Sequence, residues 1–101
     1  PISNIDIHHQ IQLLDVLKNL NKEKNITIIT ILHDLNLAAQ YSDEIILLSE
    51  GEIVTIGNPQ EVLTKEVIKE VYNIKVDMVV NPSTGRPYII PVFNELKKTG
   101  S

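Results

Sequence analysis

A run of seven apolar or β-branched residues at positions 26–32 constrains the fold of this chain most. The run does not alternate between apolar and polar residues. This pattern predicts a short strand covered on both faces, as parallel strands are in α/β proteins. His33 and Asp34 follow where the run ends. Because open parallel sheets bind ligands at the carboxyl ends of their strands, His33 is a candidate site residue.

The composition argues against several classes of protein. With 43% hydrophobic residues over 101 positions, the chain can bury a core, and it forms one domain or part of one. Its formal charge of −4, without a basic run, argues against a nucleic-acid partner. Cysteine is absent, which excludes disulfides and thiolate metal sites. No apolar run approaches the roughly 18 residues that indicate a membrane span.

Helical patterns flank the apolar run on both sides. Asp6 can cap a helix that begins at Ile7 and repeats apolar residues with a helical period, and the polar residues 21–25 are expected to end it. A second helix, short and mostly buried, is predicted over residues 34–41.

Two antiparallel hairpins are predicted further along the chain. We expect a second buried strand at residues 45–48, joined by a turn at residues 50–51 to an edge strand at 53–56. Residues 74–80 are strand-like, and residues 88–90 can pair back to them across a turn rich in proline and glycine.

Two short helices are predicted between these hairpins. Asn58 can cap the first helix, Pro59 suits its first position, and Glu61 can bond back to the cap. This helix is expected to run to about Leu63. A second helix is expected over residues 65–72.

The sequence holds no complete catalytic motif. A phosphate-binding P-loop needs a glycine-rich turn that ends in Gly-Lys-Ser or Gly-Lys-Thr, and none of the four glycines precedes a lysine. No dinucleotide fingerprint, zinc-ligand spacing or nucleophile elbow is present either. His8 and His9 are adjacent, so on a helix they point about 100° apart, which does not favour a metal site.

Several segments, taken in order, resemble the back half of the ATP-binding subunit of ABC transporters. Residues 1–6 resemble its D-loop, with Ile2 and Ile5 in place of the family's Thr and Leu, and His33 resembles its switch histidine. Four later segments resemble the importers of iron-siderophore, haem and cobalamin compounds: residues 49–54, 57–64, 71–74 and 85–91. The resemblance covers about residues 1–92.

This resemblance implies a fold and a function. The fold would be α/β, a partial P-loop NTPase (RecA-like) ABC ATPase core with parallel strands, helices and a C-terminal β-hairpin region. Residues 1–57 would be the C-terminal half of the ATPase core, 58–93 a helical and hairpin extension, and 94–101 a flexible tail. The intact subunit would use ATP and Mg²⁺ to drive import of an iron complex, haem or cobalamin. This chain alone would neither hydrolyse ATP nor bind it tightly.

The resemblance also implies partners and site residues. The subunit would form a homodimer and bind a membrane permease at the cytoplasmic face of the cell membrane. His33 would be the catalytic residue that contacts the γ-phosphate. Ser3, Asn4 and Asp6 would contact the second copy of the subunit. Asp34 would either orient His33 or cap the helix that follows, and no metal ligand is expected in this chain.

Alternatives remain open at this point. His33 and Asp34 can instead be structural, in a stand-alone α/β binding or regulatory module without catalysis. In the ABC family the P-loop strand lies between the strands that match residues 26–32 and 45–48, so its absence leaves a gap in the sheet. We expect this gap to close by re-pairing of strands or by association with another copy. Arg86 and Tyr88 are expected to anchor the C-terminal hairpin.

Overall fold

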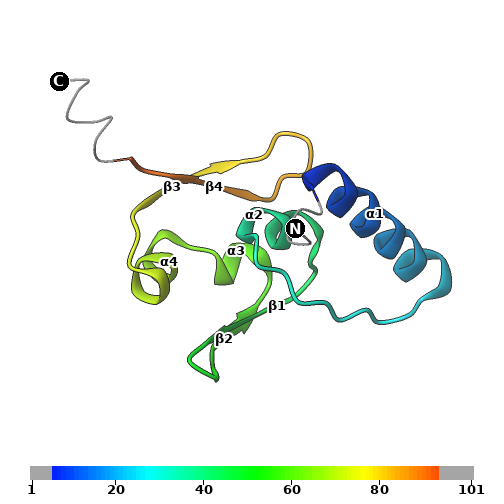
Figure 1. Cartoon of the computed structure of the whole chain (residues 1–101), viewed down its shortest axis with the longest axis horizontal. Helices are drawn as coiled ribbons and strands as arrows, with labels where there is room; N and C mark the ends of the chain where they lie inside the picture. The colour runs from blue at the N-terminus through cyan, green and yellow to red at the C-terminus, as the bar shows by residue number, and fades with distance from the viewer. Residues whose placement is uncertain (1–5, 94–101) are drawn as a thin grey trace. The chain divides into compact units, whose positions relative to one another are not determined.

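The computed structural model describes residues 6–93 of the chain (Figure 1). Its elements are α1 (Ile7–Lys24), α2 (Leu35–Tyr41), β1 (Ile45–Ser49), β2 (Glu52–Gly57), α3 (Pro59–Val62), α4 (Lys65–Tyr72), β3 (Val76–Val80) and β4 (Pro87–Pro91). The chain divides into two compact units, a first unit up to His33 and a second unit from Asp34 onward.

Helix α1 is the regular element of the first unit. The side chain of Asp6 caps its start by accepting a hydrogen bond of 3.0 Å from the backbone N–H of His9, as predicted. The helix continues through the polar residues to Lys24 and ends where Asn25 takes the left-handed conformation, with φ 54°. Asparagine tolerates that conformation, and the lysines of the last turn suit the negative end of the helix dipole.

The prediction of a strand at residues 26–32 is wrong, because these residues form neither strand nor helix. The side chains of Ile29 and Ile31 are 89% and 84% exposed. Neither strand pair of the described part of the chain includes this segment, so the expected re-pairing does not occur there. A strand needs a neighbour for its backbone hydrogen bonds, and this segment has none among residues 6–93. Association with another copy stays a prediction.

The second unit is layered. Its helices α2, α3 and α4 lie between the β1–β2 hairpin and the β3–β4 hairpin (Figure 1). Helix α3 packs on β1 and β2, helix α4 packs on β3, and helix α2 packs on β4. Both strand pairs are antiparallel, so the parallel pairing that the fold class implies is absent from residues 6–93.

The β1–β2 hairpin is confirmed, although β1 is not covered on both faces. Ile45 and Leu47 are buried, whereas Ile46 and Leu48 are 52% and 61% exposed, because the hairpin has a covering layer on one face only. The two turn residues between the strands both have positive φ, at 52° and 77°, which is the pattern of a type I′ turn. The register then shifts by one residue, a β-bulge in β2.

The remaining elements follow their sequence signals closely. The capping box of Asn58 and Glu61 is present at the start of α3, and α4 has the predicted bounds. Helix α4 ends where Asn73 takes the left-handed conformation, with φ 56°. Strand β4 pairs with β3 from Val76 opposite Pro91 to Val80 opposite Pro87, which confirms the C-terminal hairpin.

The second unit has a core of its own, drawn from every layer. Its buried cluster consists of Ala39, Ile45, Leu47, Val62, Leu63, Ile68, Val76 and Ile89. Among them Val62 and Ile68 are fully buried and Leu63 is 2% exposed. The apolar sides of the short helices α3 and α4 therefore pack against the strands of the two hairpins. This packing stabilises them, because helices of this length are not stable without tertiary contacts.

Candidate functional site

His33 lies in a bend at the end of the segment at residues 26–32, and its side chain is exposed. The segment itself is not a strand, but it is apolar and leads directly into His33. The imidazole is therefore accessible from solvent.

Asp34 is the N-cap of helix α2. Its carboxylate oxygen Oδ1 accepts hydrogen bonds from the backbone N–H groups of Asn36 and Leu37, at 2.8 and 3.1 Å. Of the two roles considered for Asp34, the structure provides the cap. The cap fixes the direction in which the chain enters α2 immediately after His33.

Asp6 caps helix α1, and its Oδ1 also lies 3.1 Å from Nδ1 of the His9 ring, with both side chains largely exposed. The other two residues assigned to the D-loop, Ser3 and Asn4, lie outside the described residues. The contact of these residues with a second copy stays a prediction.

Two amide side chains of α2 bind the C-terminal hairpin, and sequence reasoning missed them. Nδ2 of Asn36 donates to the carbonyl oxygen of Ile89 at 3.0 Å, and Oδ1 of Asn36 accepts from the N–H of Ile89 at 2.7 Å. Nε2 of Gln40 donates to the carbonyl of Pro87 at 2.9 Å. Oε1 of Gln40 accepts from Asn81 at 3.0 Å and from Thr84 at 2.6 Å.

The sequence held one signal for these contacts, the spacing of the two amide residues. Asn36 and Gln40 are four residues apart, so on a helix they share a face, and the residues around them are mostly apolar. Two amides on one face of a short, partly buried helix need polar partners. The sequence did not indicate that the partners lie some fifty positions away.

Arg86 holds the other end of α2, which confirms its predicted role as an anchor of the C-terminal hairpin. Its guanidinium nitrogen Nη1 donates to the carbonyl oxygens of Ala39 and Ser42, at 3.1 and 2.5 Å. A cation at the C-terminal carbonyls of a helix also complements the helix dipole. Nη2 of Arg86 lies 3.7 Å from the carboxylate of Asp43. Tyr88 lies opposite Val79 in the hairpin and is 41% exposed.

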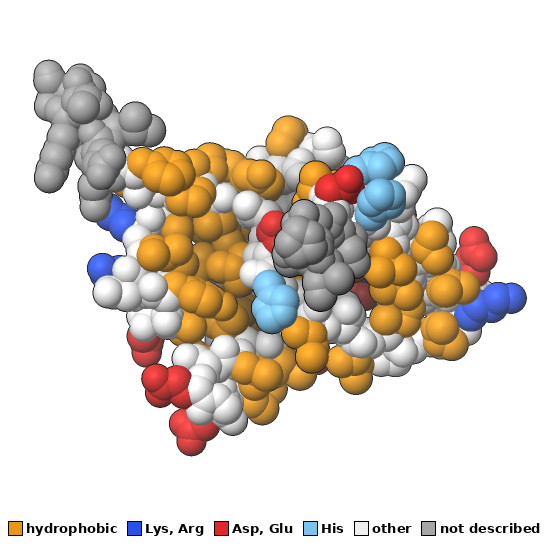
Figure 2. Space-filling view, viewed as in Figure 1, with side chains coloured by type: hydrophobic (Ala, Val, Ile, Leu, Met, Phe, Trp, Pro, Cys, Tyr) orange, Lys and Arg blue, Asp and Glu red, His pale blue; other side chains and the backbone are white. Residues whose placement is uncertain are grey.

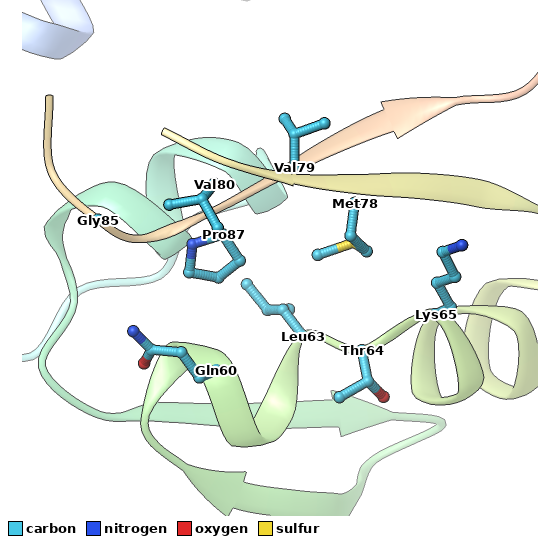
Figure 3. A pocket seen from close by; sticks show the side chains of 9 residues that line it. All are labelled: Gln60, Leu63, Thr64, Lys65, Met78, Val79, Val80, Gly85 and Pro87. Atoms are coloured by element: carbon cyan, nitrogen blue, oxygen red, sulfur yellow. The ribbon is translucent and has the colours of Figure 1, made fainter. Parts of the chain in front are cut away.

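A shallow hollow of about 340 Å³ lies between the helices α3 and α4 and the C-terminal hairpin (Figure 3). In the close-up, Leu63 and Met78 extend into the space between these elements, Gln60 and Thr64 lie below it, and Lys65 lies at its right. None of the predicted site residues lines it. Figure 2 shows hydrophobic side chains gathered around this part of the hairpin and along α1.

The described part of the chain does not by itself fit a Mg²⁺ ion or a triphosphate. Within residues 6–93, no group of three or more His, Asp or Glu side chains is placed to hold a metal ion. The printed sequence also has no P-loop to bind phosphates. No helix in this range is both long and apolar enough to cross a bilayer.

Comparison with known proteins identifies relatives along the whole chain, although no protein-family model matches it. The chain is 41% identical over 101 residues to the ferric enterobactin transport ATP-binding protein FepC of Escherichia coli (strain K12), and it covers 37% of that protein. It is 45% identical over 91 residues, 90% of its length, to the hemin import ATP-binding protein HmuV of Vibrio vulnificus (strain CMCP6), and covers 35% of it.

A solved structure has the same fold. It is a metal-chelate type ABC transporter in an inward-facing conformation, and it matches 93% of this chain and 38% of its own chain with a TM-score of 0.76 at 19% identity. The chain spans little more than a third of the length of these relatives. The chain is therefore similar to part of the ATP-binding proteins of iron-siderophore and haem importers, and over that part it has the fold of an ABC transporter.

Proposed function

We propose that the intact subunit couples ATP hydrolysis to the import of an iron-siderophore complex, haem or cobalamin. FepC is named for ferric enterobactin and HmuV for hemin, and this supports the first two substrate classes. In this proposal the subunit binds a membrane permease at the cytoplasmic face of the membrane, and two copies enclose ATP and Mg²⁺ between them.

One observation carries this proposal beyond the sequence similarity. The segment at residues 26–32 is apolar, pairs with no strand among residues 6–93, and ends at the exposed His33. Exposed Ile29 and Ile31 on an unpaired backbone cost free energy that a neighbouring strand would recover. The rest of the subunit would supply this neighbour, and His33 would then end a strand of the completed sheet.

In the completed subunit, we assign His33 to the γ-phosphate of ATP. An imidazole suits this position because one nitrogen can donate a hydrogen bond while a neighbour holds the other. Phosphoryl transfer depends chiefly on positioning and on stabilisation of charge, which such a donor provides. Ser3, Asn4 and Asp6 are assigned to the contact with the second copy. The remaining phosphate contacts and the Mg²⁺ ligands would come from the rest of the subunit.

We also propose that residues 1–57 belong to the ATPase core, that residues 58–93 form an extension and that residues 94–101 form a tail. The second unit includes residues from both sides of position 57, because β1 and α3 share one buried cluster. The extension would therefore stabilise the core rather than fold apart from it.

The test is His33→Ala in the intact subunit. We expect its rate of phosphate release to fall on the order of a hundredfold, as when a donor to the transition state is lost. His8→Ala is the matched control, since His8 is an exposed histidine on α1, and its rate should stay at the wild-type level. Near-normal turnover of His33→Ala would refute the assigned role.

A second experiment addresses the transported compound. The intact subunit, reconstituted with its permease and binding protein in vesicles, should drive ATP-dependent uptake of a ferric siderophore or of haem. Uptake of neither compound, nor of cobalamin, would refute the importer assignment even if ATP were hydrolysed.

A further inference from the structure

We propose that Asn36 is a positioning residue for His33, and that the C-terminal hairpin thereby controls the rate of ATP hydrolysis. The inference rests on the proposed function of His33. The Asn36 amide attaches the first turn of α2 to β4, and the N-cap of this turn, Asp34, directly follows His33. The hairpin would then fix the residue to which His33 is joined.

The contact of Asn36 with β4 uses both ends of the amide. It donates to the carbonyl and accepts from the N–H of one residue, Ile89, which is itself 5% exposed. The amide thus takes the place that a further strand would occupy at the edge of β4. Such a paired contact fixes both the distance and the orientation of the side chain relative to the strand.

A second contact joins the later part of α2 to the strand. Asn36 bonds to Ile89 and Gln40 bonds to Pro87, so the helix and the strand run in opposite directions. Four residues of an α-helix rise about 6 Å and two residues of a strand about 6.6 Å, so both contacts form together. Arg86 binds the carbonyls at the far end of the helix, at Ala39 and Ser42.

The start of α2 is therefore fixed twice. The carboxylate of Asp34 accepts a hydrogen bond from the backbone N–H of Asn36, and the side chain of Asn36 donates one to the carbonyl oxygen of Ile89 in β4. His33 is the residue immediately before this cap, so movement of the first turn would be passed directly to it. A displacement of about 1 Å at a reacting group can cost on the order of a hundredfold in rate.

The experiment is a double-mutant cycle of Asn36→Ala and His33→Ala in the intact subunit. Asn36→Ala should lower kcat roughly tenfold or more while KM for ATP stays within about twofold, because ATP is bound chiefly by other residues. In the His33→Ala background, Asn36→Ala should cause no further loss of kcat.

The matched control is Gln40→Ala, which removes bonds to Pro87, Asn81 and Thr84 but lies seven residues from His33. Its melting temperature should fall at least as far as that of Asn36→Ala, with kcat near the wild-type value. Asn36→Asp keeps the acceptor for the N–H of Ile89 and serves in the cycle if Asn36→Ala does not fold.

Each outcome decides the inference. It is overturned if Asn36→Ala lowers kcat by the same factor in both backgrounds, or if Gln40→Ala lowers kcat as strongly, because the effect is then one of general stability. If His33→Ala itself turns over normally, the proposed function of His33 fails, and this inference fails with it. Non-additive losses confined to Asn36 and His33 support it.

Discussion

The two units differ in how they bury apolar side chains. In the first unit, Leu14 is the only buried residue among residues 6–33, and residues such as Ile7, Leu13 and Val16 of α1 are more than half exposed. The second unit has a buried cluster that draws on both hairpins and on all of its helices, and its amides are paired across those layers.

This difference indicates where each unit obtains its stability. The second unit buries apolar side chains against one another within residues 34–93, and this burial stabilises it. The first unit has an amphipathic helix and an apolar segment with no apolar layer to cover them among residues 6–33. Its apolar side chains therefore need a covering layer from outside residues 6–33.

Hydrogen exchange should show the largest contrast between the units. In the 101-residue chain, we expect the amides of residues 28–31 to exchange at nearly unprotected rates, because they pair with no strand. The amide of Ile68, which bonds the carbonyl of Thr64 in the core, should exchange on the order of a thousandfold more slowly. Equal protection at both places would show that residues 26–32 already have a partner.

Truncation of isoleucines should sharpen the contrast in stability. Ile68→Ala creates a cavity at a fully buried position and should lower the free energy of unfolding of the second unit by about 2–5 kcal/mol. Ile29→Ala, at an 89% exposed position, should change it by less than about 0.5 kcal/mol. Urea denaturation measures both. A large cost for Ile29→Ala in this chain would contradict the division into units.

Arg86 tests the polar contacts within the second unit. Arg86→Ala leaves the carbonyls of Ala39 and Ser42 without their donor and should cost about 1–3 kcal/mol. Lys65→Ala is the control, because Lys65 lies 3.9 Å from Asp77 in an exposed ion pair that should contribute less than about 1 kcal/mol. If both variants melt alike, the contact of Arg86 with α2 is not stabilising.

The helix caps should give the smallest effects. Asp34→Ala should lower stability by about 1 kcal/mol, since the N–H groups of Asn36 and Leu37 lose their acceptor. Asp34→Asn keeps an acceptor and should restore most of this loss. Thermal melting of the two variants provides the comparison, and equal melting temperatures would argue against the cap.

The elements that the sequence predicted well are those whose signals are local. The capping box of Asn58 and Glu61, the cap by Asp6 and the stop at Asn73 each depend on residues within one helical turn. The turn at residues 50–51 likewise depends on the conformations that Gly51 and its neighbour can adopt. Local chemistry of this kind fixed most element boundaries to within two residues.

What the sequence could not predict depends on distant partners. The apolar run at residues 26–32 indicates that a strand can form there, but not whether a neighbour is at hand to pair with it. The same holds for Asn36, whose partner Ile89 lies 53 positions later. For the candidate site, the cap by Asp34 was one of two roles considered. The strand expected before His33 did not form, and the sequence did not predict the contact of α2 with the hairpin.

The equal spacing of the contacts between α2 and β4 restricts how this part of the molecule can evolve. One residue inserted between Asn36 and Gln40 would turn the later amide by about 100° around the helix. One residue inserted between Pro87 and Ile89 would reverse which side of the strand its backbone groups face. Insertions and deletions in relatives should therefore fall outside both intervals, and engineered loops or tags should avoid them.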